Sequence, residues 1–189
     1  GGSGKSGGTP TILPGWVNGL QMGNILRIDN GQGVLNDRTA ASLTLASAEL
    51  RLQGGATGVV ENISNGVTVN GGFGLITFGT LAGGGTLQIY TNTASGGLQR
   101  SNGATVLVRG INAGTSGFVW ANQAGSGIGQ SGSANTTTKG ILPWALVDYS
   151  GTGSGISFQP TDSSSAWSRP LNYATEMSQS VAAGTVNLL

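Results

Sequence analysis

Residues 42–78 read SLTLASAELRLQGGATGVVENISNGVTVNGGFGLITF and carry the clearest structural pattern in the chain. Polar and apolar residues alternate at 43–45 (LTL), at 50–52 (LRL) and at 67–69 (VTV). Alternation that gives one apolar face is typical of a half-buried β-strand. Glycine, asparagine and Ala-Ser pairs interrupt the chain between these runs. The stretch therefore predicts a series of short strands joined by tight corners.

The same pattern continues on both sides of this stretch. Apolar runs lie outside the stretch at residues 25–28, 86–90 and 105–109, and further runs lie within it at 49–53, 59–63 and 75–78. Within residues 43–78, successive runs begin about 7 to 9 residues apart, which leaves no room for an intervening helix. We therefore expect an all-β protein.

Two strand arrangements fit this spacing. In an antiparallel meander, Asn65-Gly66 and Asn70-Gly71 would form two-residue hairpin turns. In a parallel β-solenoid with three strands per coil, each residue would stack on one about 24 positions later. Leu43 would then lie near Val67, and Leu50 near Leu75.

We favour the parallel β-solenoid, or β-helix, because its corners suit this composition. Tight bends need positive φ angles, which glycine and asparagine tolerate, and stacked polar side chains can pair there. The residues expected to line one core are Leu43, Leu45, Leu50, Leu52, Val67, Val69, Leu87 and Ile89.

The pattern changes along the chain and predicts three parts. Residues 1–19 form a glycine-rich linker or docking segment, and residues 20–110 form the β-solenoid core. Residues 111–189 form a looser β-rich extension that ends in a terminal strand at 181–189. Three of the four tryptophans lie in this extension.

The composition excludes several classes of protein. The chain has 36 glycines among 189 residues, yet 37% of its residues are hydrophobic, which argues against disorder. It has no His and no Cys, so we expect no His-dependent catalytic triad, no zinc or haem site and no cofactor. A net charge of +1 is no footprint for nucleic acid. No run approaches the length of a membrane-spanning helix, so we expect no membrane insertion.

A family resemblance rests on several segments that occur in order. These are LRLQGG at 50–55, LITFGTLAGGGTLQI at 75–89, RSNGATVLVRGINAG at 100–114, ILPWA at 141–145, Asp148, residues 155–158, RPL at 169–171 and Glu176. Over residues 40–177 the chain resembles bacterial proteins with autotransporter-associated β-strand repeats. The resemblance implies a secreted, surface-exposed β-helical protein built of many such units. It implies no catalytic residues.

Two patterns in the chain are typical of catalytic sites, but each has a simpler explanation. GGSGKS at 1–6 is similar to the end of a phosphate-binding loop, with Lys5 and Ser6 as its Lys and Ser. Its following residues cannot start the helix that such a loop needs, so a linker is the better interpretation. Asp37 and Glu61 would lie one coil apart and could form a carboxylate pair of the kind found in glycosidases. Arg38 adjoins Asp37, and isolated acids at corners are usually solvated, so we expect no enzyme.

Aromatic and asparagine residues suggest binding or modification more weakly. Trp120, Trp144 and Trp167 could stack against sugars, but Trp144 beside a proline in an apolar run is expected to be buried. Residues 62–64 and 135–137 match the N-glycosylation pattern, which arises by chance in so Asn- and Thr-rich a chain. Residues 29–31 (DNG) are expected to form a turn rather than a calcium loop.

These observations predict a structural extracellular protein. We expect a self-associating unit of a bacterial surface fibre, filament or layer, with an adhesin or carbohydrate-binding module, or a phage tail-fibre segment, as alternatives. The terminal coil of a solenoid exposes unpaired backbone groups that must be covered. We therefore expect copies to associate head-to-tail, with residues 1–10 or 185–189 of one copy adding to the next.

Overall fold

The computed structural model consists of β-strands and their connections in the part of the chain that it describes. The described residues are 11–12, 15–17, 20–22, 24–29, 42–53, 59–63, 66–79, 87–91, 98–110, 116–120, 128–131, 134–149, 155–161 and 166–177. Within these ranges there is no helix. The predicted all-β class is confirmed for this part of the chain.

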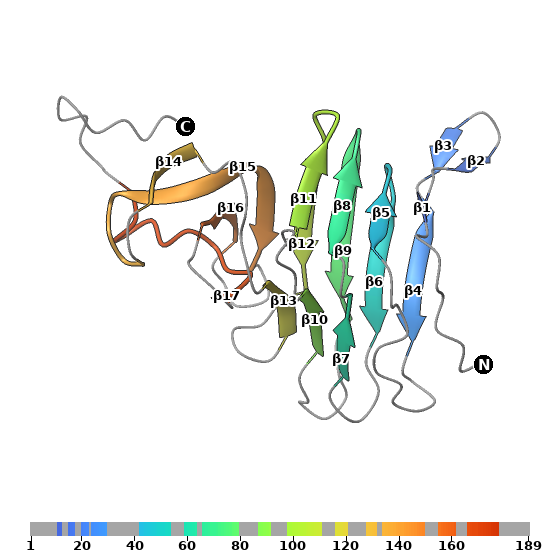
Figure 1. The fold of residues 1–189 in the computed structure, drawn as a ribbon, viewed down its shortest axis with the longest axis horizontal. Helices are drawn as coiled ribbons and strands as arrows, with labels where there is room; N and C mark the ends of the chain where they lie inside the picture. Colours follow the sequence, from blue (N-terminus) through green and yellow to red (C-terminus); the bar gives the residue numbers. More distant parts are fainter. Residues whose placement is uncertain are drawn as a thin grey trace.

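Three sheets hold most of the strands (Figure 1). Sheet A is parallel and consists of β1 (Thr11–Ile12), β5 (Leu43–Leu45), β8 (Val67–Asn70) and β11 (Leu98–Ser101). Sheet B has a parallel part of β4 (Ile25–Asp29), β6 (Glu49–Gln53), β9 (Phe73–Phe78), β12 (Thr105–Arg109) and β15 (Lys139–Asp148). Sheet C has a parallel part of β7 (Val59–Asn62), β10 (Leu87–Thr91) and β13 (Ser116–Trp120).

Antiparallel strands join the later part of two sheets. β14 (Ile128–Ser131) and β16 (Ile156–Pro160) both pair with β15 in sheet B. β17 (Ala166–Trp167) pairs with β13 in sheet C. A separate hairpin is formed by β2 (Gly15–Val17) and β3 (Leu20–Met22). The described strands are therefore mostly parallel, with antiparallel pairing concentrated in the second half.

Successive strands enter the three sheets in a fixed order. β5, β6 and β7 lie in sheets A, B and C, and the triplets β8–β10 and β11–β13 repeat this order. The Asn70-Gly71 dipeptide, considered above as a hairpin turn, instead connects strands of two different sheets. The antiparallel meander is therefore wrong for this region. The other candidate turn begins at Asn65, which lies outside the described residues.

The register confirms one predicted contact and corrects another. Leu43 lies opposite Val67, as expected for strands one coil apart. Leu50 lies opposite Ile76 rather than Leu75. The reason is that Leu45 and Glu49 are four residues apart, whereas the residues opposite them, Val69 and Leu75, are six apart, so the β9 partners lie two residues further along the chain.

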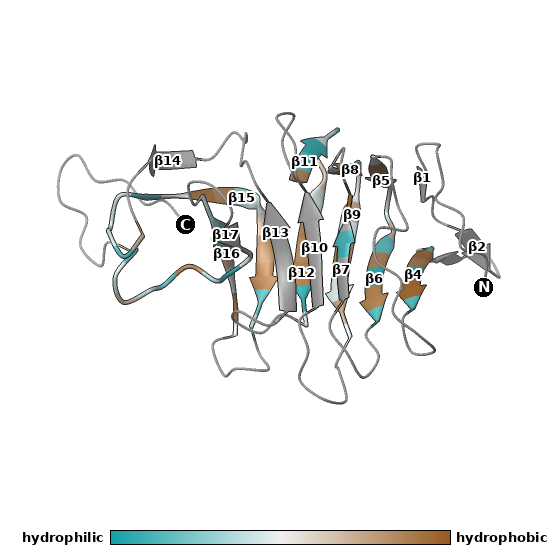
Figure 2. Ribbon diagram, turned by 60° about the horizontal axis from the view of Figure 1, so that its bottom comes forward, coloured by the Kyte–Doolittle hydropathy of each residue, from teal (hydrophilic) through white to brown (hydrophobic). Residues whose placement is uncertain are grey.

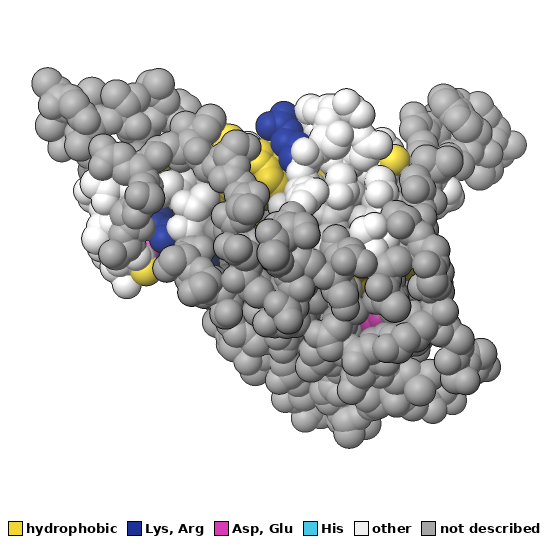
Figure 3. Space-filling model, in the orientation of Figure 1, with side chains coloured by type: hydrophobic (Ala, Val, Ile, Leu, Met, Phe, Trp, Pro, Cys, Tyr) yellow, Lys and Arg dark blue, Asp and Glu magenta, His cyan; other side chains and the backbone are white. Residues whose placement is uncertain are grey.

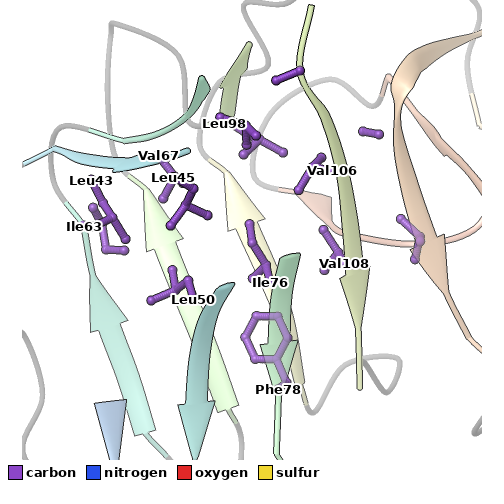
Figure 4. Packing of buried hydrophobic residues seen from close by; sticks show 14 of the residues in the cluster. Leu43, Leu45, Leu50, Ile63, Val67, Ile76, Phe78, Leu98, Val106 and Val108 are labelled. Carbon is purple, nitrogen blue, oxygen red and sulfur yellow. The ribbon is translucent and has the colours of Figure 1, made fainter. Parts of the chain in front are cut away.

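One hydrophobic cluster joins sheets A and B (Figure 4). Six of the predicted core residues are fully buried in it, with 0% exposure: Leu43, Leu45, Leu50, Leu52, Val67 and Val69. The side chains of the other two, Leu87 and Ile89, lie outside the description. Ile76 and Phe78 of β9 and Val106 and Val108 of β12 extend the same cluster. The alternation seen in the sequence therefore separates the core face of sheet B from its outer face.

The corners between sheets A and B have the predicted chemistry. Ser47, Gly71 and Asn102 all have positive φ angles of 48°, 68° and 49°. At two successive corners, Asn102 Nδ2 donates a hydrogen bond of 2.7 Å to Asn70 Oδ1. The corners between sheets A and B therefore contain residues that tolerate the left-handed region, and their polar side chains pair from one corner to the next.

Several sequence predictions concern residues that the structure does not describe. The linker residues 1–10, the terminal strand at 181–189 and the proposed end-to-end contacts of both segments lie outside it.

β15 continues sheet B beyond residue 111, where it pairs with β12 from Val106 opposite Ala145 to Arg109 opposite Asp148.

Candidate interaction surface

The outer face of sheet B carries a row of polar side chains. The register places Arg27, Arg51, Thr77, Arg109 and Asp148 opposite one another on β4, β6, β9, β12 and β15. These positions alternate with the buried positions of the same strands, so the row lies on the solvent side. Figure 2 shows hydrophilic and hydrophobic residues following one another along β4 and β6. We call this row the outer ladder.

Glu49 lies beside the outer ladder and binds two of its arginines. Arg51 Nε and Nη2 donate hydrogen bonds of 3.0 and 3.1 Å to the two carboxylate oxygens of Glu49. Arg109 Nη2 lies 3.5 Å from Glu49 Oε1. Arg109 Nε also donates a 2.9 Å hydrogen bond to Thr77 Oγ1. Side chains from three strands are thereby joined in one charged network.

The carboxylate of Glu49 is held in its ionised form. Burial raises its pKa, because the side chain of Glu49 is only 10% exposed. Hydrogen bonds from Thr77 and Arg51 and the positive charges of Arg51 and Arg109 outweigh burial and lower the pKa below its ordinary value. A carboxylate with this environment is a poor proton donor, so the network is suited to holding strands together rather than to acid catalysis.

The outer ladder ends in an exposed ion pair at β4. Arg27 Nη2 lies 2.7 Å from Asp29 Oδ2, and the two side chains are 55% and 46% exposed. A pair this exposed contributes little to stability. Both side chains are about half exposed on β4, the last described strand of sheet B.

An apolar row runs beside the outer ladder. Ile25, Leu75, Leu107 and Leu146 occupy it together with Glu49, and Phe158 of β16 continues it. Ile25 is 52% exposed, and the leucines and Phe158 are half-buried. The outer face thus presents a charged row and an apolar row side by side.

A second charged network lies in the extension. Glu176 is fully buried, and its carboxylate accepts hydrogen bonds from Arg169 Nη1 and Nη2 at 2.8 and 2.7 Å. The backbone N–H groups of Asn135 and Asn172 donate two more, each of 2.9 Å. Burial raises the pKa of Glu176, but these hydrogen bonds and the Arg169 charge lower it to about 2. This network joins residues 135, 169 and 172 and has a structural role.

Of the two acids considered as a catalytic pair, only Glu61 lies among the described residues. Glu61 lies in β7 and has 0% exposure. Asp37 lies outside the described residues, as do Lys5 and Ser6 of the phosphate-loop-like segment. Among the described residues, no group of three or more acids forms a candidate metal site.

The aromatic prediction is confirmed for one residue. Trp144 is buried in the core cluster with 4% exposure, as expected from its apolar surroundings. The backbones of Trp120 and Trp167 lie in the adjacent strands β13 and β17, but their side chains are outside the description. Trp144 therefore cannot offer a stacking face to a sugar.

The two glycosylation patterns and the expected turn at residues 29–31 are described only in part. Asn135 is exposed, has a φ of 62° and accepts a 3.3 Å hydrogen bond from Thr175 Oγ1. Ser64 of the other glycosylation pattern lies outside the described residues. Asp29 ends β4, and the two residues that follow it are not described.

Sequence reasoning missed the Glu49–Arg51–Arg109 network. The alternation Glu49, Leu50, Arg51, Leu52 shows that the two charges share a face, so their contact could have been inferred. Arg109 is far away in the sequence, and its place beside Glu49 depends on the register of β6, β9 and β12. The sequence contains no direct signal for that register.

Comparisons with known proteins identify no relative. The sequence matches no family model, no curated protein and no solved structure. In the described part of the chain, no helix is long and apolar enough to cross a membrane.

Proposed function

We propose that this chain is a structural unit of an extracellular bacterial surface protein, built as a parallel β-solenoid and without catalytic activity. The fixed order in which strands enter sheets A, B and C supports the solenoid. Each triplet would be one coil, and each sheet would be one side of the solenoid. The buried cluster that joins sheets A and B would be its core.

The resemblance to autotransporter-associated β-strand repeats supports the extracellular bacterial setting. The residues that carry it fall at structural positions in this chain. RSNGATVLVRG covers the end of β11, the corner that follows and β12, and ILPWA lies within β15. Arg169 and Glu176 form the buried network of the extension. In a repeat of this kind, these residues would form the strands and hold the extension in place.

Self-association is the function that the surface supports best. The observation that carries this proposal is the outer end of sheet B, where β4 pairs with β6 on one side and with no described strand on the other. A sheet edge with an apolar side favours addition of another strand. Glu49 and Arg51 of β6 and Arg109 of β12, on the outer face of the same sheet, bind one another.

Two measurements distinguish the proposed structural unit from the adhesin and phage tail-fibre alternatives. Electron microscopy and light scattering on the purified protein should show concentration-dependent assembly. Tryptophan fluorescence titrated with a panel of bacterial and host oligosaccharides should show no saturable shift. A saturable shift from a protein that stays monomeric would contradict the structural proposal and support a carbohydrate-binding module. Assembly into isolated trimers would favour a tail fibre.

A further inference from the structure

Asn-Gly dipeptides occur at several places in the chain, at residues 18–19, 30–31, 65–66, 70–71 and 102–103. Asparagine is chemically labile, and a following glycine, which has no Cβ, leaves the next backbone N–H open to react with the side-chain amide. The structure describes the glycine of the last three dipeptides, namely Gly66, Gly71 and Gly103. The surroundings of these three backbone amides can therefore be compared.

Two of the three glycine amides are held in hydrogen bonds. Gly66 N donates to Ile63 O at 3.0 Å, and Gly71 N donates to Ser101 O at 3.1 Å. No described residue accepts a hydrogen bond from Gly103 N. Of these three amides, the amide of Gly103 alone can react without first breaking a hydrogen bond within the described part of the chain.

The turn that contains Asn102 and Gly103 is open to solvent. Both residues are exposed, and a Cβ at Gly103 would meet no atom within 4 Å. Ala104 N donates a 3.1 Å hydrogen bond to Ser101 O, which closes the turn around the two residues. Figure 3 shows polar and backbone atoms at the upper surface of the molecule, where Figure 1 places the turn between β11 and β12. Water and hydroxide ion can therefore reach the Asn102–Gly103 peptide group.

The side chain of Asn102 also contributes to the fold. Its Nδ2 donates the 2.7 Å hydrogen bond to Asn70 Oδ1 at the preceding corner. A carboxylate has no proton to donate, so aspartate at position 102 cannot form this bond. Replacement of the amide by a carboxylate thus removes a contact between two corners and adds a negative charge there.

We propose that Asn102 is a site of spontaneous deamidation, in which the Gly103 backbone amide attacks the Asn102 side chain. Gly103 N loses its proton to a solvent base and bonds to Asn102 Cγ. The Cγ–Nδ2 bond breaks, and Nδ2 takes up a proton and leaves as ammonia. Water then opens the resulting succinimide ring. The reaction involves no oxidation or reduction, and it is independent of the function proposed above.

The two ways of opening the ring have different consequences for the corner. Cleavage of the new bond between Gly103 N and Cγ leaves aspartate in an unchanged backbone. Cleavage of the original peptide bond leaves isoaspartate, which inserts one additional carbon into the backbone of the turn between Ser101 and Ala104. Either product lowers the formal net charge of the chain from +1 to 0. Modified copies should therefore separate from unmodified ones by charge.

The test compares Asn102 with Asn70 in the same folded protein. The purified chain is incubated at mildly alkaline pH and digested under acidic conditions, and aspartate and isoaspartate at each position are measured by peptide mass spectrometry. Asn102 should deamidate about fivefold faster than Asn70, because Gly71 must first break its hydrogen bond to Ser101. In concentrated urea, where both corners are unfolded, the two rates should become similar.

Gly103→Ala should slow the reaction at Asn102 and leave the rate at Asn70 unchanged, since a methyl group crowds the attacking nitrogen. Circular dichroism confirms that this variant keeps its fold. Equal rates at Asn102 and Asn70 in the folded protein, or a faster rate at Asn70, would overturn the proposal. Reaction at Asn102 only in urea would also overturn it, because the folded corner would then block the attack.

Discussion

At the residue scale, Glu176 shows how one buried charge can hold an irregular segment in place. Residues 168–172 contain no described strand, yet they lie against β16. Leu171 N donates hydrogen bonds to Phe158 O at 3.0 Å and to Ser157 Oγ at 3.2 Å. Glu176 then fixes the Arg169 end of the segment through two hydrogen bonds. The carboxylate replaces the strand pairing that this segment lacks.

Replacing Glu176 by Gln should destabilise the protein by about 2–3 kcal/mol. The amide removes the charge that Arg169 binds and turns N–H donors toward neighbouring donors. Urea unfolding followed by tryptophan fluorescence measures the change. Tyr173→Phe is the control, because Tyr173 lies in the same turn and is 44% exposed. Equal stability of the two variants would contradict the role assigned to Glu176.

The same carboxylate should make stability depend on acid pH. Its pKa is about 2 in the folded protein and near 4.5 when unperturbed. A lowered folded-state pKa stabilises the fold fully above the unfolded-state pKa, and this stabilisation is lost as pH falls toward the folded-state pKa. The stability gap between the wild type and Glu176→Gln should therefore be full at neutral pH and shrink between about pH 4.5 and 2. Unfolding curves at several pH values measure it, and a gap that does not change with pH would show that the charge is not responsible.

At the element scale, two glycines in similar backbone conformations should respond differently to alanine. Gly103 and Gly110 have φ angles of 68° and 73°. A Cβ at Gly110 would collide with the carbonyl oxygen of Phe78, whereas one at Gly103 would meet no atom within 4 Å. Gly110 therefore lets β12 leave its sheet close to the backbone of β9.

We expect Gly103→Ala to cost about 1 kcal/mol, the penalty for a side chain in the left-handed region. Gly110→Ala should cost about 3 kcal/mol or more, because a steric collision is added to that penalty. Thermal or urea unfolding of both variants measures the difference. Equal losses would mean that the chain leaves β12 by a different path.

Eight of the described strands, β4 to β10 and β12, could be predicted from apolar runs in their own sequence. β6 and β12 have the bounds of the runs ELRLQ and TVLVR. β11 was not predicted, since Leu98 is its only apolar residue and its pairing with β8 makes it a strand. The register could be predicted between Leu43 and Val67 but not between β6 and β9. Corner lengths vary, and no residue pattern specifies where the next strand resumes.

The same limit applies to the candidate surface. Alternation places Arg27, Arg51 and Arg109 on outer faces, and this much follows from the sequence. Which of them meets Glu49, and which stays exposed at an edge, depends on the order of the strands in sheet B. The order of the strands in sheet B depends on how all of them pair, so it cannot be predicted from the sequence of any one strand.

At the scale of the whole molecule, the proposed solenoid would stack equivalent positions of successive coils in parallel. Thr44 and Thr68 lie opposite each other on β5 and β8, and Gln99 lies opposite Thr68 on β11. Neighbouring strands lie about 4.8 Å apart, so Thr44 is within disulfide range of Thr68. Gln99 lies two strands away from Thr44, at about twice that distance. The chain has no cysteine, so introduced cysteines have no competing partner.

The most direct test is disulfide formation in the variants Thr44→Cys/Thr68→Cys and Thr44→Cys/Gln99→Cys. Each purified monomer is oxidised at low concentration, and intramolecular disulfide is measured by mass spectrometry of peptides and by mobility on non-reducing gels. Coiling with parallel strands predicts near-complete formation between positions 44 and 68 and little between 44 and 99. Failure of the first pair to form a disulfide, or equal formation in both variants, would contradict the coiled parallel arrangement.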